Sequence, residues 1–218
     1  MEKKITVFGV IGEGFVIGMK NALSLLGAIV LYVLTIWVPY INVGTTIAMC
    51  TIPIELAKGN VISPLFIFKG QYRRYIGEFF TLYGMMFMAL IPALLFLIVP
   101  GIVVALGWSL ALYLLLDKGI APGEAMVKSN KATYGYKWTI FGVSIVVGLA
   151  VGLVGGACYL IDETFGIIMN VIISLVVGFG LLGCDAVIYR DLTADEPSVD
   201  VLEETVIETN VDEGEKDA

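Results

Sequence analysis

Residues 121–142 read APGEAMVKSNKATYGYKWTIFG, a segment with one proline and three lysines that lies between two long apolar stretches. Proline is favoured in the first turn of a helix, where its missing N–H has no intrahelical partner to lose. Glu124 precedes Lys128 by four positions, which is the favourable order for an ion pair on a helix surface. The segment therefore predicts an amphipathic helix over 122–134 that lies on the membrane surface and leads into a span at Trp138.

The composition places the chain in the membrane class. Of its 218 residues, 58% are hydrophobic and only 15% are charged, whereas soluble domains keep about 25% charged residues. There is no histidine, and Cys50, Cys158 and Cys184 have no CxxC spacing. We therefore expect no disulfide framework, no metal site and no cofactor.

Three stretches that almost lack charge, 21–54, 79–116 and 138–184, predict three helical hairpins. Each is too long for one crossing, because about 20 residues span a bilayer. Each also has a central break, at Pro39, at "IVPG" 98–101 and at "IDETFG" 161–166. We expect an all-α integral membrane bundle of six transmembrane helices, over 21–38, 41–57, 78–99, 101–116, 138–161 and 165–189. The spans at 21–38, 41–57 and 101–116 are short, so each is either a thin crossing or part of a hairpin that enters only part way.

The basic residues predict the orientation of these spans. They precede the first span, lie between the second and third and between the fourth and fifth, and follow the sixth: Lys3, Lys4, Lys20, Lys58, Lys69, Arg73, Arg74, Lys118, Lys128, Lys131, Lys137 and Arg190. Short loops rich in Lys and Arg stay in the cytoplasm. The sequence thus predicts a multi-pass protein of the cell (inner) membrane with both termini in the cytoplasm.

A string similar to 121–142 occurs 58 residues earlier, SPLFIFKGQYRRYIGEFFTLYG at 63–84. Pro64 matches Pro122 and Gly77 matches Gly135, which indicates a repeated unit of amphipathic helix and hairpin. The alternative is that two hairpins share membrane-entry chemistry by chance.

Each copy carries basic residues that make it a candidate for contact with anionic lipid headgroups. The lipid-interface candidates are Lys69, Arg73, Arg74, Lys128 and Lys131. Membrane lipids are the expected partners, with anchoring and topology as the plainer role for these residues. No nucleic acid partner is expected.

Small residues recur every fourth position in the fifth span, at Ser144, Gly148, Gly152 and Gly156. Such a stripe lets another helix approach closely. We expect its partner to be the sixth span; a second copy of the chain, in a homo-oligomer, is the alternative. The pattern G-x-G-x-x-G at 178–183 does not indicate a nucleotide site, because no strand precedes it.

Two polar residues of the sixth span, Asn170 and Asp185, are candidates for a polar path through the bundle, because polar groups inside spans are often functional. Interfacial ion pairing and hydrogen bonding between helices is the plainer interpretation. No nucleophile–base pair is apparent, so no catalytic residue is predicted.

Residues 1–192 are predicted to form the membrane domain and residues 193–218 an acidic tail. The tail holds ten acidic residues against Lys216 and no aromatic residue, a composition typical of disorder. It either solvates the cytoplasmic face or captures a basic cytoplasmic partner.

The string LLLDKGIAPGEAMVKSNKATYGYKWTIFGV, with Asp117, Pro122, Glu124, Ser129 and Lys137, resembles the membrane domain of bacterial glycerophosphodiester phosphodiesterases and its stand-alone relatives of unknown function. The resemblance covers about 90–150. It implies a six-helix prokaryotic membrane protein, without the phosphodiesterase domain and its activity.

Three function classes remain. A non-enzymatic membrane scaffold or accessory protein is favoured, a small oligomeric channel or transporter is the alternative, and a membrane enzyme is the third. The lack of histidine and of deeply placed charges weighs against the enzyme.

Overall fold

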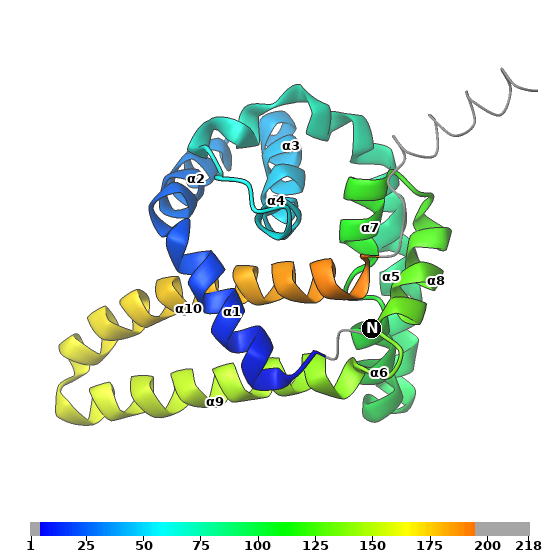
Figure 1. The fold of residues 1–218 in the computed structure, drawn as a ribbon. Coiled ribbons are helices and arrows are strands. Elements are labelled where there is room, and N and C mark those ends of the chain that lie inside the picture. Colours follow the sequence, from blue (N-terminus) through cyan, green and yellow to red (C-terminus); the bar gives the residue numbers. More distant parts are fainter. Residues whose placement is uncertain (1–4, 195–218) are drawn as a thin grey trace, which may run out of the picture.

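The computed structural model describes residues 5–194, and the secondary structure of this part of the chain is all helical, without strands (Figure 1). The predicted acidic tail lies, from residue 195 on, outside the described residues. The elements are α1 (Val7–Lys20), α2 (Ala22–Thr35), α3 (Pro39–Cys50), α4 (Ile52–Ala57), the 3-10 segments η1 (Pro64–Phe68) and η2 (Gly70–Tyr75), α5 (Ile76–Phe96), α6 (Ile98–Gly107), α7 (Ala111–Lys118), α8 (Pro122–Ala132), α9 (Lys137–Ile161) and α10 (Glu163–Leu192).

Two of the three predicted breaks are confirmed, and the middle one lies at Leu97, just before the predicted 98–101, which is helical within α6. Pro39 opens α3, and Leu97 adopts an extended backbone between α5 and α6. Asp162 is extended between α9 and α10, and its side chain accepts a hydrogen bond from the Phe165 backbone N–H at 2.9 Å. This carboxylate satisfies one of the amides that a helix start leaves unpaired, so the turn at the hairpin tip is capped.

An unpredicted break divides the expected span 101–116 into α6 and α7. Ser129 of α8 causes it: its hydroxyl donates to the Gly107 carbonyl at 2.7 Å and accepts from the Leu110 N–H at 3.1 Å. Thr133 donates to the same carbonyl at 3.3 Å. These side chains replace the intrahelical hydrogen bonds that the break removes.

Helix α1 crosses α10 at a contact made of glycines. A Cβ added to Gly183 would lie 1.9 Å from the Gly14 carbonyl oxygen, and one added to Gly18 would lie 2.0 Å from the Phe179 carbonyl oxygen. The two backbones therefore touch, which only glycine allows. Gly183 belongs to the G-x-G-x-x-G pattern, so the physical role of that pattern in this chain includes helix packing.

Within residues 5–194, five helical stretches are long and apolar enough to cross a membrane: Pro39–Ala57, Gly70–Leu95, Ile98–Lys118, Lys137–Ile161 and Glu163–Leu192. A sixth exists if α1 and α2, which meet at a bend of 69°, are counted as one span. The chain thus has the character of a multi-pass membrane protein.

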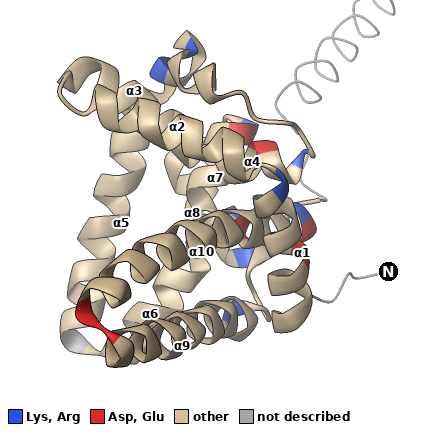
Figure 2. Cartoon of the chain, turned by 90° about the vertical axis from the view of Figure 1, so that its left-hand side faces the viewer, with Lys and Arg blue, Asp and Glu red and all other residues tan. Residues whose placement is uncertain are grey.

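These stretches do not all run side by side, so the predicted bundle of six spans in three hairpins is not confirmed (Figures 1 and 2). The α9–α10 hairpin extends away from the rest, and α5 runs across its direction (Figures 1 and 2). Helix α5 packs instead against α6, α8, α7 and α3.

The first predicted hairpin does not separate its tip from the basic segment. The guanidinium of Arg73 in η2 lies 5.8 Å from the centre of the Tyr40 ring, and the Arg73 side chain packs on Gly44 of α3. The prediction that 38–41 and 69–74 lie on opposite faces of the bilayer is therefore wrong. The reason is not length, because α3 and α4 together are long enough to cross. Instead η1 and η2 fold back against α3, and this brings Arg73 to Tyr40.

The predicted amphipathic helices are also corrected. Segment 64–75 is two 3-10 turns with an extended Lys69 between them, so its apolar residues do not share one face. Tyr72 is buried, whereas Leu65 is exposed. Helix α8 forms as expected, with the Glu124–Lys128 pair at 3.2 Å. Its inner face, however, is covered by the chain's own helices, because Ala125 and Ser129 are fully buried.

The two proposed repeats agree at one point and differ at another. Lys58-Gly59 and Lys118-Gly119 both end a helix with a left-handed glycine, at φ +74° and +61°. Gly135 has φ +87°, whereas its counterpart Gly77 lies within α5. The similarity of the two units is therefore clearest at their helix ends.

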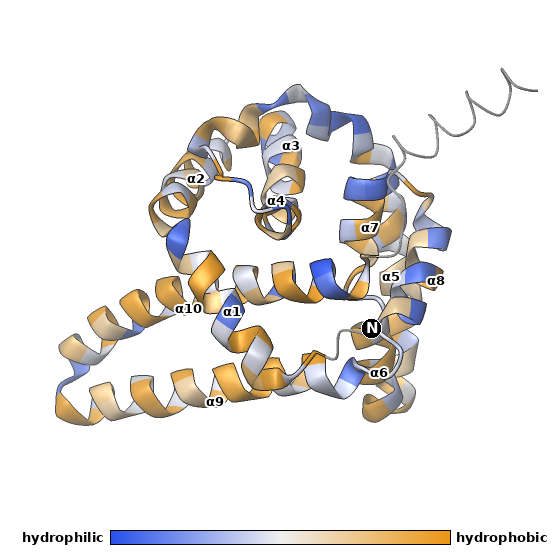
Figure 3. Ribbon diagram, viewed as in Figure 1, coloured by the Kyte–Doolittle hydropathy of each residue, from blue (hydrophilic) through white to orange (hydrophobic). Residues whose placement is uncertain are grey.

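Charged side chains concentrate away from the middle of the long apolar helices. Lys and Arg gather near η2, α8 and the ends of α1 and α10, and the tip of the α9–α10 hairpin carries only the acidic pair Asp162 and Glu163 (Figure 2). The outer halves of α9 and α10 are almost uniformly apolar up to that tip (Figure 3).

The contact between Tyr40 and Arg73 gives a direct test of the first hairpin. In a variant without the native cysteines, the pair Tyr40→Cys and Arg73→Cys is expected to crosslink with a short bis-maleimide in intact membranes. The matched pair Tyr40→Cys and Lys131→Cys, which the fold does not bring together, is the control. If the pair at 40 and 73 crosslinks no better than this control, the first hairpin crosses the bilayer as the sequence predicts.

Candidate functional site

The inner half of α10 gathers charged and phenolic side chains from four helices. Asp117, at the end of α7, has a side chain only 8% exposed. It accepts a hydrogen bond from the Tyr189 hydroxyl of α10 at 2.5 Å, and it pairs with Lys58 at the end of α4 at 2.5 Å. Lys118 lies 3.9 Å from the same carboxylate. A buried charge is costly unless it is paired. The partners of the Asp117 carboxylate come from α4 and α10, so the carboxylate links these two helices to α7.

A second carboxylate, that of Asp185, lies on α10 one helical turn before Tyr189. The Tyr113 hydroxyl of α7 donates to Asp185 Oδ2 at 3.3 Å, and the Tyr113 and Tyr189 rings meet edge to face at 5.7 Å. Within residues 5–194, no lysine or arginine lies within 4 Å of Asp185, and Tyr113 is its only hydrogen-bond partner. Asp185 therefore differs from Asp117, whose charge is compensated.

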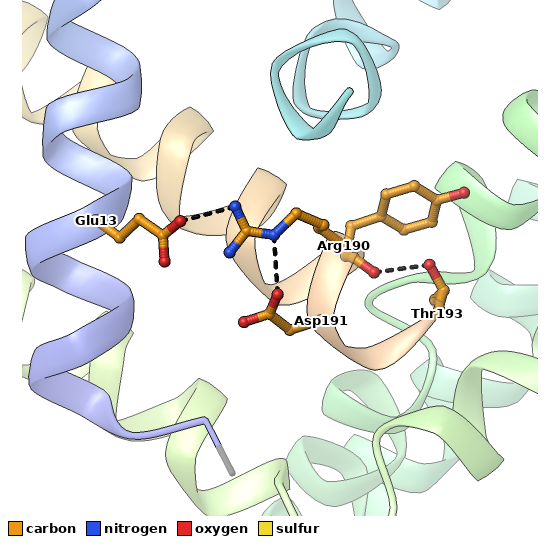
Figure 4. Close-up of polar contacts among 5 residues, drawn as sticks. Glu13, Arg190, Asp191 and Thr193 are labelled. Atoms are coloured by element: carbon orange, nitrogen blue, oxygen red, sulfur yellow. Dashed lines mark hydrogen bonds and ion pairs between the residues drawn. The ribbon is translucent and has the colours of Figure 1, made fainter. Parts of the chain in front are cut away.

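A third group fixes the end of α10 to α1 (Figure 4). Arg190 donates to Glu13 at 2.7 Å and to Asp191 at 2.9 Å, so one guanidinium holds two carboxylates from different helices. Thr193 then donates to the Tyr189 carbonyl at 2.7 Å and satisfies a backbone group where α10 ends. The arrangement fixes the rotation of α1 about the glycine crossing.

An open groove of about 360 Å³ borders Asp185. Ile29 of α2 forms one wall, and one face of α10 forms the other, from Ser174 through Leu175 and Gly178 to Asp185. Apart from Ser174 and Asp185, the side chains that line the groove are apolar.

The two predicted polar-path residues have separate environments. Asn170 donates to the carbonyls of Gly155 and Gly166 at 3.4 and 3.1 Å, and so joins the outer halves of α9 and α10. It lies 15 positions from Asp185, or about 22 Å along the helix. The structure does not bring these two side chains together, although both border grooves on the same face of α10.

The expected internal partner of the glycine stripe is not found. Added Cβ atoms at Gly148, Gly152 and Gly156 would meet no atom of the described residues within 4 Å. It is Gly155 that faces α10, where a Cβ would lie 2.7 Å from Asn170 Oδ1. The stripe turns outward because α9 uses the neighbouring face to reach α10.

The lipid-interface candidates divide into two groups. Lys69, Arg73 and Arg74 are exposed around η2, and Lys131 is exposed on α8, whereas Lys128 is half-buried. The two groups lie on different parts of the surface (Figure 2). They therefore do not form one continuous basic patch.

Sequence reasoning missed the clusters around Asp117 and Arg190. The pair Glu13 and Arg190 is separated by 177 positions, and no spacing rule connects such residues. The glycine crossing had a signal: Gly14 and Gly18 are four apart, as in other close helix contacts.

The described residues contain no group of three His, Cys, Asp or Glu side chains placed to hold a metal ion. Comparison of the chain with protein-family models, with curated proteins and with solved structures finds no match.

The hydrogen bond from Tyr189 to Asp117 has a measurable consequence. Tyr189→Phe removes a donor to a buried carboxylate, which we expect to cost about 1.5–3 kcal/mol of stability. Thermal unfolding of the purified protein in detergent measures the change. The control is Tyr134→Phe, whose side chain is 81% exposed. Equal midpoints for the two variants would show that the Asp117 cluster does not stabilise the fold.

Proposed function

We propose that the chain is a non-enzymatic integral membrane scaffold or accessory protein that acts through helix contacts in the bilayer. The outer half of the α9–α10 hairpin carries the main support. Its side chains extend beyond both buried clusters of the protein and expose large apolar groups: Leu149, Leu153, Val154, Leu160, Ile161, Ile167, Ile168, Val171 and Ile172.

The outward stripe of Gly148, Gly152 and Gly156 gives this surface a specific feature. Lipid chains cover any apolar helix, but a smooth glycine stripe also admits the backbone of another helix. Since α10 does not use it, a helix from a second copy or from a different membrane protein is the occupant that a scaffold requires.

The proposed setting is the cell (inner) membrane, with both termini on the cytoplasmic side. A first hairpin that enters only part way keeps its start and end on one side, so the even number of remaining crossings preserves this orientation. The exposed basic residues around η2 face anionic headgroups in this arrangement. The acidic tail is proposed to bind a basic cytoplasmic partner.

The resemblance to the membrane domain of the phosphodiesterases stays a proposal. The residues that carry the resemblance have structural roles, which supports an architectural motif. Ser129 fixes the break between α6 and α7, Asp117 joins three helices, and Lys137 donates to Asn130 at 2.7 Å.

A small oligomeric channel or transporter is the second candidate. The groove beside Asp185 and the shallower groove beside Asn170 share Ser174 and Leu175, so together they follow one face of α10 through the apolar region. Such a polar row is typical of solute pathways.

Photo-crosslinking tests the scaffold proposal. A photoreactive amino acid at Leu153, 74% exposed beside the stripe, is expected to give a discrete protein adduct in native membranes. Gly152→Leu fills the stripe without a clash inside the chain and should abolish that adduct. The same probe at Leu95 of α5 is the control for general exposure. Lipid adducts alone at Leu153, unchanged by Gly152→Leu, would refute the proposal.

A further inference from the structure

We propose that the groove between α2 and α10 binds a lipophilic cation, such as a quaternary ammonium or phosphonium compound, with Asp185 as its counter-charge. This inference goes beyond the scaffold and does not depend on it.

The groove has the charge that a cation requires. Asp185 is its only charged lining residue in the described chain, and Tyr113 donates a single hydrogen bond to one of the two carboxylate oxygens. In contrast, Asp117 pairs with Lys58, and Asp191 pairs with Arg190. A carboxylate in apolar surroundings is unfavourable unless an opposite charge compensates it. The groove is therefore selective for a positive ligand.

The walls of the groove are mostly apolar. Ile29, Leu175, Phe179 and Leu182 offer apolar surface and no hydrogen-bonding groups from their side chains. A small metal ion needs several oxygen ligands to replace its water, and the lining supplies only Asp185 and Ser174 side chains. A quaternary cation needs no hydrogen bonds, so apolar walls and one carboxylate complement it fully.

The groove is large enough for a small molecule. The groove volume of about 360 Å³ falls within the range of about 300–1,000 Å³ that is usual for small-molecule sites. Gly178 lies in its floor, and a Cβ there would meet no atom within 4 Å. A larger side chain at this position would thus occupy the ligand's place without disturbing the helix contacts.

Binding of tetraphenylphosphonium to the purified full-length chain in an uncharged detergent tests the proposal. Equilibrium dialysis with labelled compound should show saturable binding, and tetraphenylborate, of the same shape but opposite charge, should not compete. Asp185→Asn keeps the shape of the side chain and should weaken binding by about thirtyfold or more, as loss of a partly buried charge partner does.

Two further variants make the result specific. Gly178→Leu should abolish binding by filling the groove, and it gives an independent answer should Asp185→Asn fail to fold. Glu163→Gln removes an exposed negative charge from the same helix and should leave binding unchanged. Equal competition by tetraphenylborate, or undiminished binding by Gly178→Leu and Asp185→Asn, would overturn the proposal.

Discussion

The crossing of α1 over α10 is the constraint on which the rest of the structure depends. At Gly14, Gly18 and Gly183 the two backbones approach so closely that an added Cβ would meet a backbone atom at 1.9 to 2.5 Å. Dispersion and backbone contacts act over the whole crossing, since no side chain separates the helices. The Arg190 pair with Glu13 and Asp191 then fixes the rotation of α1 about this point.

From this crossing the structure divides into an inner, closely packed part and an outer, exposed part. The inner half of α10 lies between two buried clusters, because Val187 and Ile188 belong to one and Phe179 and Ala186 to the other. The outer half leaves both clusters, and among the described helices it runs beside α9 (Figure 1). This division supports assigning stability to the inner part and external contacts to the outer part. The Asp185 groove lies along the border between the two parts.

The sequence predicted features that depend on local chemistry. Helix breaks at Pro39 and Asp162, the Glu124–Lys128 pair and the all-helical, membrane-like class follow from residue type and short spacing, and the structure confirms them. Features that depend on distant parts of the chain were wrong or missed. The first hairpin was expected to carry Tyr40 away from Arg73. Apolar length alone cannot show that η2 folds back onto α3 and brings the two side chains together.

The candidate site, too, could be predicted from the sequence only in part. Asp185 and Asn170 could be selected from the sequence because polar residues are rare in apolar spans, but their separate partners could not. In the sequence, Tyr113 and Tyr189 resemble ordinary membrane aromatics. Their hydrogen bonds to Asp185 and Asp117 are formed only in the folded chain. The glycines of α9 show the limit of a stripe rule: Gly155, outside the four-residue pattern, is the one that faces α10.

The stability of Gly183→Ala against Gly152→Ala tests the central claim most directly. Both changes place alanine in a helix, which by itself favours the helical state by about 1 kcal/mol. At Gly152 the added methyl group meets nothing, so unfolding in detergent should need equal or higher temperature than in the unchanged protein. At Gly183 the methyl group meets the Gly14 carbonyl, and overpacking should lower stability by about 1–3 kcal/mol. A Gly183→Ala protein as stable as Gly152→Ala would contradict the claim that this crossing organises the fold.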